Sequence, residues 1–99
     1  MATERLRRRR ATIKDKRDGI MKDLEPSFEF IDYLISKDVF ASEVIEEIQS
    51  VPTRRGRIEI MLTHLKYADE GDYGSFIEAL LKSKQKSIVN FINGKFFFA

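Results

Sequence analysis

Apolar residues recur along this chain with the spacing of amphipathic α-helices. In the clearest segment, Tyr73, Phe76, Ile77, Leu80 and Leu81 occupy positions i, i+3, i+4, i+7 and i+8. Residues with this spacing lie on one face of a helix and form its buried stripe. No segment alternates apolar and polar residues for long enough to indicate a β-strand. The chain is therefore predicted to be all-α.

The same spacing predicts five further helices. In chain order, their apolar positions are Leu6, Ile13, Ile20 and Leu24; Phe30, Ile31, Leu34 and Ile35; Val44, Ile45 and Ile48; Ile58, Met61, Leu62 and Leu65; and Ile88, Phe91 and Ile92. Gly19 interrupts the first stripe and predicts a bend, because glycine costs a helix about 1 kcal/mol relative to alanine. Short connections such as 37–40 and 68–71 predict neighbouring helices that pack antiparallel. The expected architecture is one bundle of six helices.

Capping residues set the predicted boundaries of these helices. Serine, threonine and aspartate side chains accept hydrogen bonds from the free N–H groups of a first turn, and glycine often follows a last turn. The predicted N-caps are Ser42, Thr53 and Asp72, with Gly71 in the preceding turn; Pro26–Ser27 begins another helix and Gly94 ends the last one.

Charge is segregated along the chain. Residues 1–24 contain nine Lys or Arg and four Asp or Glu, residues 25–53 contain one and seven, and residues 54–99 contain eight and five. The net charges are therefore +5, −6 and +3, within a total of +2. A small domain with such segments can present one positive and one negative surface.

Three arginines, Arg54, Arg55 and Arg57, occupy the first turn of the helix that follows Thr53. The helix macrodipole disfavours a cation at this end by about 0.3–1 kcal/mol at an exposed site. This cost is small enough for the arrangement to be tolerated.

Composition narrows the possible functions. A length of 99 residues, with 42% hydrophobic and 34% charged residues, suits one globular domain. No apolar run approaches the roughly 20 residues that span a bilayer, and no apolar segment follows the N-terminal basic residues, unlike a secretory signal. Cysteine is absent, which excludes disulfides and thiolate chemistry. The expected location is intracellular and cytoplasmic, with no membrane partner.

No catalytic, metal or cofactor site is predicted. His64 is the only histidine and stands beside an apolar stripe, where a packed helical residue is expected. Gly94–Lys95 lacks the glycine spacing and the following Ser or Thr of a phosphate-binding loop. The run Arg7–Arg10 suits contacts to phosphates, but no aromatic side chains interleave with it. Nucleic-acid binding is therefore only a remote alternative.

Four motifs resemble those of caspase recruitment domains (CARDs) of the death-fold superfamily. They are D-Y-L-I-S-K-D-V-F at 32–40, V-I-E-E-I-Q at 44–49, P-T-R-R at 52–55 and D-Y-G-S-F-I-E-A-L-L at 72–81. The last two are similar to the CARD of the apoptosome scaffold protein; the first two, with the arginine-rich first helix, are similar to that of its initiator caspase. The resemblance implies an all-α, six-helix antiparallel bundle with death-fold Greek-key topology.

The resemblance also implies where the domain ends. Residues 1–94 are expected to form the CARD. Residues 95–99, which include Phe96, Phe97 and Phe98, are expected to be a hydrophobic tail or the start of a missing segment.

CARDs bind like-folded domains by joining a basic patch on the first and fourth helices to an acidic patch on the second and third. Carried over to this chain, the resemblance implies a basic patch of Arg10, Arg17, Arg54, Arg55 and Arg57 and an acidic patch of Asp32, Glu46 and Glu47. Two residues depart from the relatives. Lys37 stands where the CARD of the scaffold protein tends to have an acidic residue, and Glu59 stands where the fourth helix of the caspase CARD has a further arginine. The chain is therefore not assigned to one side of the interaction alone.

The predicted function is a non-enzymatic module that recruits an initiator caspase to its activating scaffold. The expected partner is another CARD-containing protein, a caspase or an apoptosome-type scaffold, and a homo-oligomer is also possible. The alternatives are an innate-immune adaptor that forms filaments, a CARD-only decoy regulator and, remotely, a basic nucleic-acid-binding domain.

Overall fold

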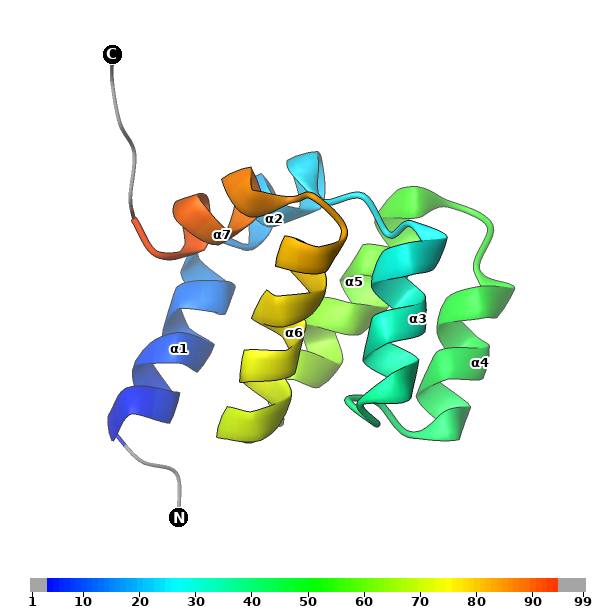
Figure 1. Ribbon diagram of the computed structural model, residues 1–99, viewed down its shortest axis with the longest axis horizontal. Helices are drawn as coiled ribbons and strands as arrows, with labels where there is room; N and C mark the ends of the chain where they lie inside the picture. The colour runs from blue at the N-terminus through cyan, green and yellow to red at the C-terminus, as the bar shows by residue number, and fades with distance from the viewer. Residues whose placement is uncertain (1–3, 95–99) are drawn as a thin grey trace.

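Residues 4–94, which the computed structural model describes, form seven α-helices (Figure 1). The bounds are Glu4–Asp15 for α1, Arg17–Asp23 for α2, Phe28–Ser36 for α3, Ser42–Ser50 for α4, Arg54–Leu65 for α5, Glu70–Lys82 for α6 and Lys86–Ile92 for α7. Within these residues no strand occurs, and the all-α prediction is confirmed. The predicted tail at 95–99 lies outside the described residues.

The seventh helix arises because the predicted first helix is divided into α1 and α2. The division falls at Lys16, whose backbone leaves the helical conformation with φ −101° and ψ 11°. Its side-chain Nζ donates a hydrogen bond of 2.6 Å to the carbonyl of Phe91, in the last turn of α7. The same carbonyl also accepts a hydrogen bond from the N–H of Gly94 at 3.2 Å, so Lys16 adds a charged donor to the last turn of α7. Lys16 therefore joins the junction of α1 and α2 to the end of α7.

The predicted bend at Gly19 is wrong, because Gly19 lies inside α2. A Cβ atom at this position would collide with the ring of Phe91. The glycine therefore permits α7 to approach the backbone of α2, and it does not relax the helix.

Two of the predicted N-caps need correction, and two helix starts are confirmed. Thr53 accepts a hydrogen bond from the N–H of Gly56 at 3.1 Å, and Ser27 caps α3 in the same way. The cap of α6 is Asp69, three residues before the predicted Asp72, whose N–H donates to the Asp69 carboxylate at 2.7 Å. Gly71 consequently lies in the first turn of α6. The cap of α4 is Ala41, without a side-chain bond.

The end of α7 agrees with its prediction. The helix ends at Ile92, and Gly94 follows with φ 69°. This is the left-handed conformation that glycine adopts without steric cost.

The predicted apolar stripes meet in one core. The rings of Phe30 on α3 and Phe76 on α6 are fully buried and pack edge to face, with centroids 5.9 Å apart. Two predicted stripe residues do not join the core, because Ile35 is 39% exposed and Leu81 is 42% exposed. Each lies near the end of its helix, one residue after a buried leucine. A step of one residue turns a side chain by about 100° around the helix.

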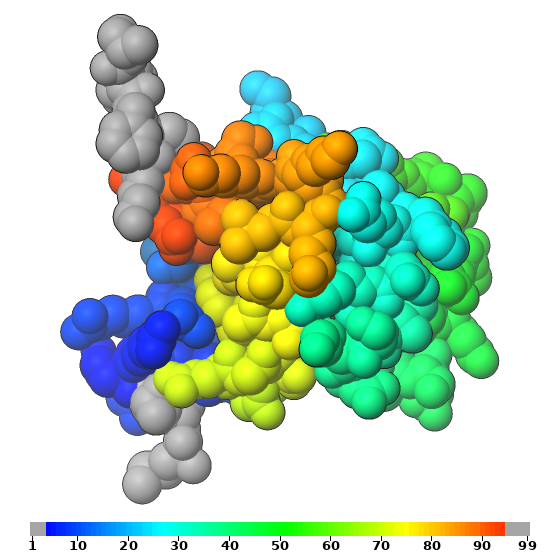
Figure 2. Space-filling view, viewed as in Figure 1, coloured from blue at the N-terminus to red at the C-terminus, as the bar shows by residue number. Residues whose placement is uncertain are grey.

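Helix packing places the basic helix α1 and the acidic helix α4 at opposite sides of the domain. α3 packs against α6, α4 packs against α5, and α2 packs against both α5 and α7. Figure 1 shows α1 at one side of the bundle and α4 at the other, with α6, α5 and α3 between them. The arginine-rich α1 is therefore far from the acidic α4, and Figure 2 shows the same separation on the molecular surface.

Candidate protein-interaction surfaces

The structure brings the predicted basic residues of α2 and α5 close together. Arg17 begins α2, and its Nη2 lies 3.4 Å from Oε1 of Glu59 on α5. Arg55 stands four residues before Glu59 and so lies on the same face of α5. The side chain of Arg55 is exposed, and it makes no hydrogen bond or ion pair with any other residue in 4–94. Arg55 is therefore exposed and unpaired within residues 4–94, whereas Arg17 is half-buried and paired with Glu59.

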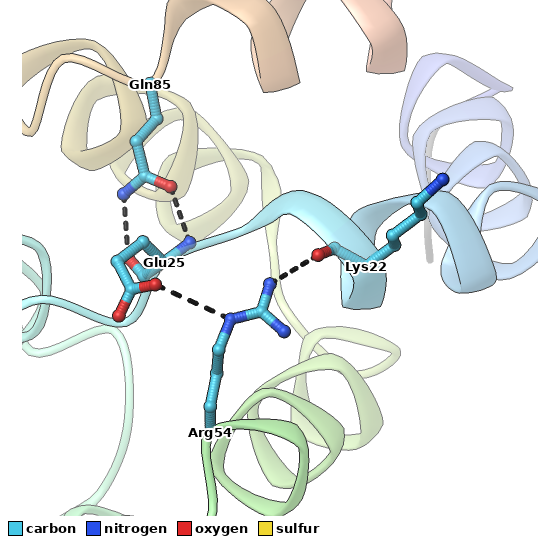
Figure 3. Close-up of polar contacts among 4 residues, drawn as sticks. All are labelled: Lys22, Glu25, Arg54 and Gln85. Carbon is cyan, nitrogen blue, oxygen red and sulfur yellow. Dashed lines mark hydrogen bonds and ion pairs between the residues drawn. The ribbon is translucent and has the colours of Figure 1, made fainter.

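Arg54 has a different environment from Arg55, although the two are adjacent. Its Nη2 donates a 2.6 Å hydrogen bond to the carbonyl of Lys22, and its Nε lies 3.5 Å from the carboxylate of Glu25 (Figure 3). The backbone of Glu25 is held in turn by the amide of Gln85, through bonds of 2.7 and 2.8 Å. Arg54 thus joins the start of α5 to the end of α2 and to the segment before α7. Its role in the structure is internal.

Arg10 and Arg57 also bind backbone carbonyls of their own chain. The guanidinium of Arg10 donates two hydrogen bonds, of 3.2 and 2.7 Å, to the carbonyl of Ala68 in the loop between α5 and α6. Nε of Arg57 donates to the carbonyl of Val51 at 2.7 Å. Both side chains are half-buried. Three of the five predicted basic residues, Arg10, Arg54 and Arg57, therefore donate side-chain hydrogen bonds to backbone carbonyls of their own chain.

Sequence reasoning did not find the role of Arg9. Its guanidinium carbon lies 5.0 Å from the ring centroid of Tyr73, which is a cation–π distance. Burial of Tyr73 raises the pKa of its phenol to about 12, and the nearby charge of Arg9 opposes this rise. The contact attaches α1 to α6, and only the fold brings these two residues together.

The predicted acidic residues are all exposed and lie on two neighbouring helices. Asp32 is on α3, and Glu46 and Glu47 are on α4. The two helices together carry five acidic side chains and no basic one; the other two are Glu29 and Glu43. Such a surface has a negative potential that attracts a basic partner.

Glu46 and Glu47 point to different sides of α4. Glu46 borders a hollow that Ile35 of α3 also lines. Glu47 borders another hollow together with Glu59 of α5. The acidic residues of α4 therefore divide, with Glu46 towards α3 and Glu47 towards α5.

Other kinds of site find little support among the described residues. In residues 4–94, no three His, Cys, Asp or Glu side chains gather where they could hold a metal ion. The same residues contain no helix with the length and apolarity to cross a membrane. His64 is half-buried, as expected, and its ring meets that of Phe40 edge to face at 6.4 Å.

Comparison with known proteins identifies the family. The family model of the caspase recruitment domain matches residues 10–95 of this chain. The chain therefore belongs to the CARD family of the death-fold superfamily. CARDs are protein-interaction domains that bind other death-fold proteins, and the family is not a catalytic one. A search of curated proteins finds no match to the chain.

Proposed function

We propose that this domain recruits a CARD-containing partner through two oppositely charged surfaces. The basic surface comprises Arg17 and Arg55, and the acidic surface comprises Asp32 and Glu46. The observation that supports this proposal best is the contrast between Arg55 and its neighbours: it is exposed without a partner in residues 4–94, whereas Arg54 and Arg57 bind carbonyls. A cation kept at an unfavourable helix end without an internal role suits an intermolecular contact.

The physical chemistry of arginine fits this role. A guanidinium can meet a carboxylate through two parallel hydrogen bonds, which orient the two proteins as well as attract them. Complementary surfaces also accelerate encounter and reject partners of like charge. Because the two surfaces lie on different helices, a contact between like-folded domains is head to tail. Such contacts propagate into rings or helical assemblies.

The biological role that follows is recruitment of an apoptotic initiator caspase to its activating scaffold in the cytoplasm. The domain itself performs no catalysis, and the activity belongs to a partner or to another domain. Recruitment raises the local concentration of the caspase, which makes a second encounter effectively intramolecular. An inflammatory adaptor or a CARD-only decoy would use the same two surfaces. A decoy would differ by ending an assembly at one copy.

Charge reversal at each surface tests the proposal. The wild-type chain, Arg55→Glu and Asp32→Arg are used to capture the CARDs of the apoptosome scaffold and of its initiator caspase. The matched control is Lys86→Glu, an exposed lysine in the first turn of α7. We expect Arg55→Glu to abolish capture of the partner that presents an acidic surface, and Asp32→Arg to abolish capture of the partner that presents a basic surface. Lys86→Glu should capture the same partners as the wild-type chain. Capture that is equal for all four chains would refute the proposal.

A further inference from the structure

A hollow of about 230 Å³ lies between α1, α6 and α7, on helices that the proposed contact surfaces do not use. The close packing of α1 is with α2, whereas α6 packs against α3 and α7. Figure 1 shows α1 beside α6, with α7 above both. Because α1 and α6 do not pack closely against each other, a hollow remains between them.

The walls of this hollow combine apolar and polar groups. Ile77 of α6 and Ile92 of α7 supply aliphatic surface, and Tyr73 of α6 supplies an aromatic side chain. Arg9 of α1 and Asn93, just after α7, carry N–H donors. None of the described residues that line the hollow is acidic. The lining therefore has one positive charge next to an apolar wall.

The guanidinium of Arg9 has no hydrogen-bond acceptor within the described residues. Arg10, its half-buried neighbour, donates two hydrogen bonds to the carbonyl of Ala68. Arg9 is half-buried as well, but it makes no hydrogen bond or ion pair with any residue in 4–94. Its contact with the ring of Tyr73 provides no acceptor for the N–H groups. A partly buried charge without an acceptor is unfavourable unless solvent or a ligand supplies one, so Arg9 has free donors for an anion.

Two neighbouring residues of α6 favour an anion with an apolar part. Burial raises the pKa of Tyr73 to about 12, so its phenol stays protonated at neutral pH and adds no negative charge. At Gly74, no atom beyond its chain neighbours and its own helix backbone lies within 4 Å of the place where a Cβ atom would stand. The hollow is therefore open beside the backbone of α6. Its volume is below the roughly 300–1,000 Å³ of most small-molecule sites, which limits the ligand to about one ring and one acidic group.

We propose that this hollow binds a small aromatic acid, a molecule with one ring and one carboxylate or phosphate group. The guanidinium of Arg9 meets the anion through two parallel hydrogen bonds, and the ring packs against Ile77 and Ile92. Such a ligand joins α1, α6 and α7, and it stabilises the folded chain by mass action. The inference does not depend on the proposed function, whose surfaces lie on other helices.

Titration of the whole chain with phenyl phosphate, followed by nuclear magnetic resonance of the backbone amides, tests this inference. Inorganic phosphate, which lacks the ring, and benzyl alcohol, which lacks the charge, are the control ligands. We expect phenyl phosphate to shift the signals of Thr12, Gly74 and Asn93, which line the hollow, until they saturate. The expected dissociation constant is on the order of 1 mM. Each control ligand should bind at least about tenfold more weakly.

Two pairs of variants assign the binding to Arg9 and to the hollow. Arg9→Gln should abolish it, whereas Arg8→Gln, at the exposed neighbouring position, should leave it unchanged. Gly74→Leu should fill the hollow and abolish binding, whereas Gly74→Ala should retain it. Leucine and alanine are both better helix formers than glycine, so neither Gly74 variant should unfold at a lower temperature than the wild-type chain.

The outcomes separate a site from binding to exposed charge. Loss of binding in Arg9→Gln and in a stably folded Gly74→Leu chain would support the hollow as the site. An equal response to inorganic phosphate, or signals that shift at the exposed Arg5, Arg7 and Arg8 in place of the hollow, would overturn the inference. Failure of the wild-type chain to bind phenyl phosphate would overturn it as well, and would leave the proposed function untouched.

Discussion

Single residues of one type perform different tasks in this domain. Arg54 and Arg55 are neighbours in the sequence, yet Arg54 binds the carbonyl of Lys22 and the carboxylate of Glu25, whereas Arg55 is exposed without a partner in residues 4–94. The difference follows from helical geometry, because consecutive side chains point about 100° apart. Arg54 turns towards the end of α2, and Arg55 turns towards solvent.

Stability measurements on these two arginines test the assignment. Arg54→Ala removes a charged donor from a backbone carbonyl and should lower the free energy of unfolding by about 1 kcal/mol. Arg55→Ala should change it by less than about 0.5 kcal/mol, as expected for an exposed residue without contacts. Urea unfolding followed by circular dichroism measures both. An equal loss in the two variants would contradict the internal role of Arg54.

Glu59 moderates the basic surface. Its carboxylate lies 3.4 Å from Arg17 and one turn from Arg55, so a partner's acid must compete with it. Glu59→Gln should therefore raise the association rate with an acidic partner by roughly twofold to fivefold at low salt. The half-exposed pair contributes little to folding, so stability should hardly change. Stopped-flow measurement of the association rate tests this prediction. A slower association would show that Glu59 itself contacts the partner.

At the scale of elements, the junction of α1 and α2 depends on its contact with α7. Lys16 donates to the carbonyl of Phe91 and also lies 5.2 Å from the centroid of its ring. The same ring occupies the space next to Gly19. One aromatic residue of α7 therefore organises both the break between the two helices and the approach of α2.

Gly19→Ala tests this close approach. In an exposed helix the change would stabilise by up to about 1 kcal/mol. Here the added methyl group must displace the Phe91 ring, and we expect a net loss of about 1 kcal/mol in the free energy of unfolding. The double variant with Phe91→Leu should lose less than the sum of the two single changes. A stabilised Gly19→Ala chain would show that α7 does not constrain this site.

Particular residues show how far the sequence predicts the elements. The positions of the helices can be predicted from the apolar spacing, because a buried stripe is a local pattern. Thr53 can likewise be predicted as an N-cap, because a cap binds the first turn of its own helix. Asp69 and Asp72 stand three residues apart, and the sequence alone does not distinguish which of them caps α6; in the structure it is Asp69. The partner of Arg10 is the carbonyl of Ala68, 58 residues away. The tasks of individual arginines therefore depend on tertiary contacts that local patterns do not contain.

At the scale of the whole molecule, the proposed function gives the domain two different contact surfaces. Arg55 is on α5, and Asp32 is on α3. In the proposed contacts, each copy presents its arginine surface to one neighbour and its acidic surface to another. The segregation of charge in the sequence, +5, −6 and +3 along the chain, predicts this arrangement before the structure is known.

A mixing experiment tests this polarity. Arg55→Glu leaves only the acidic surface, and Asp32→Arg leaves only the basic one. Each variant alone should remain monomeric, and an equal mixture should form a one-to-one complex at low salt, because one intact contact remains but cannot propagate. Raising the salt should dissociate it, since exposed charges are screened. Light scattering provides the masses; a mixture that stays monomeric while the wild type associates would contradict head-to-tail contacts.

The affinity of Arg55→Glu for a partner CARD, measured by calorimetry beside its free energy of unfolding, tests the central claim most directly. An acid at this helix start interacts favourably with the macrodipole, so stability should stay unchanged or rise by about 0.3–1 kcal/mol. Affinity should fall by about 2 kcal/mol or more, because an interfacial cation becomes an anion. Unchanged affinity, or a loss of affinity that merely follows a loss of stability, would contradict the account.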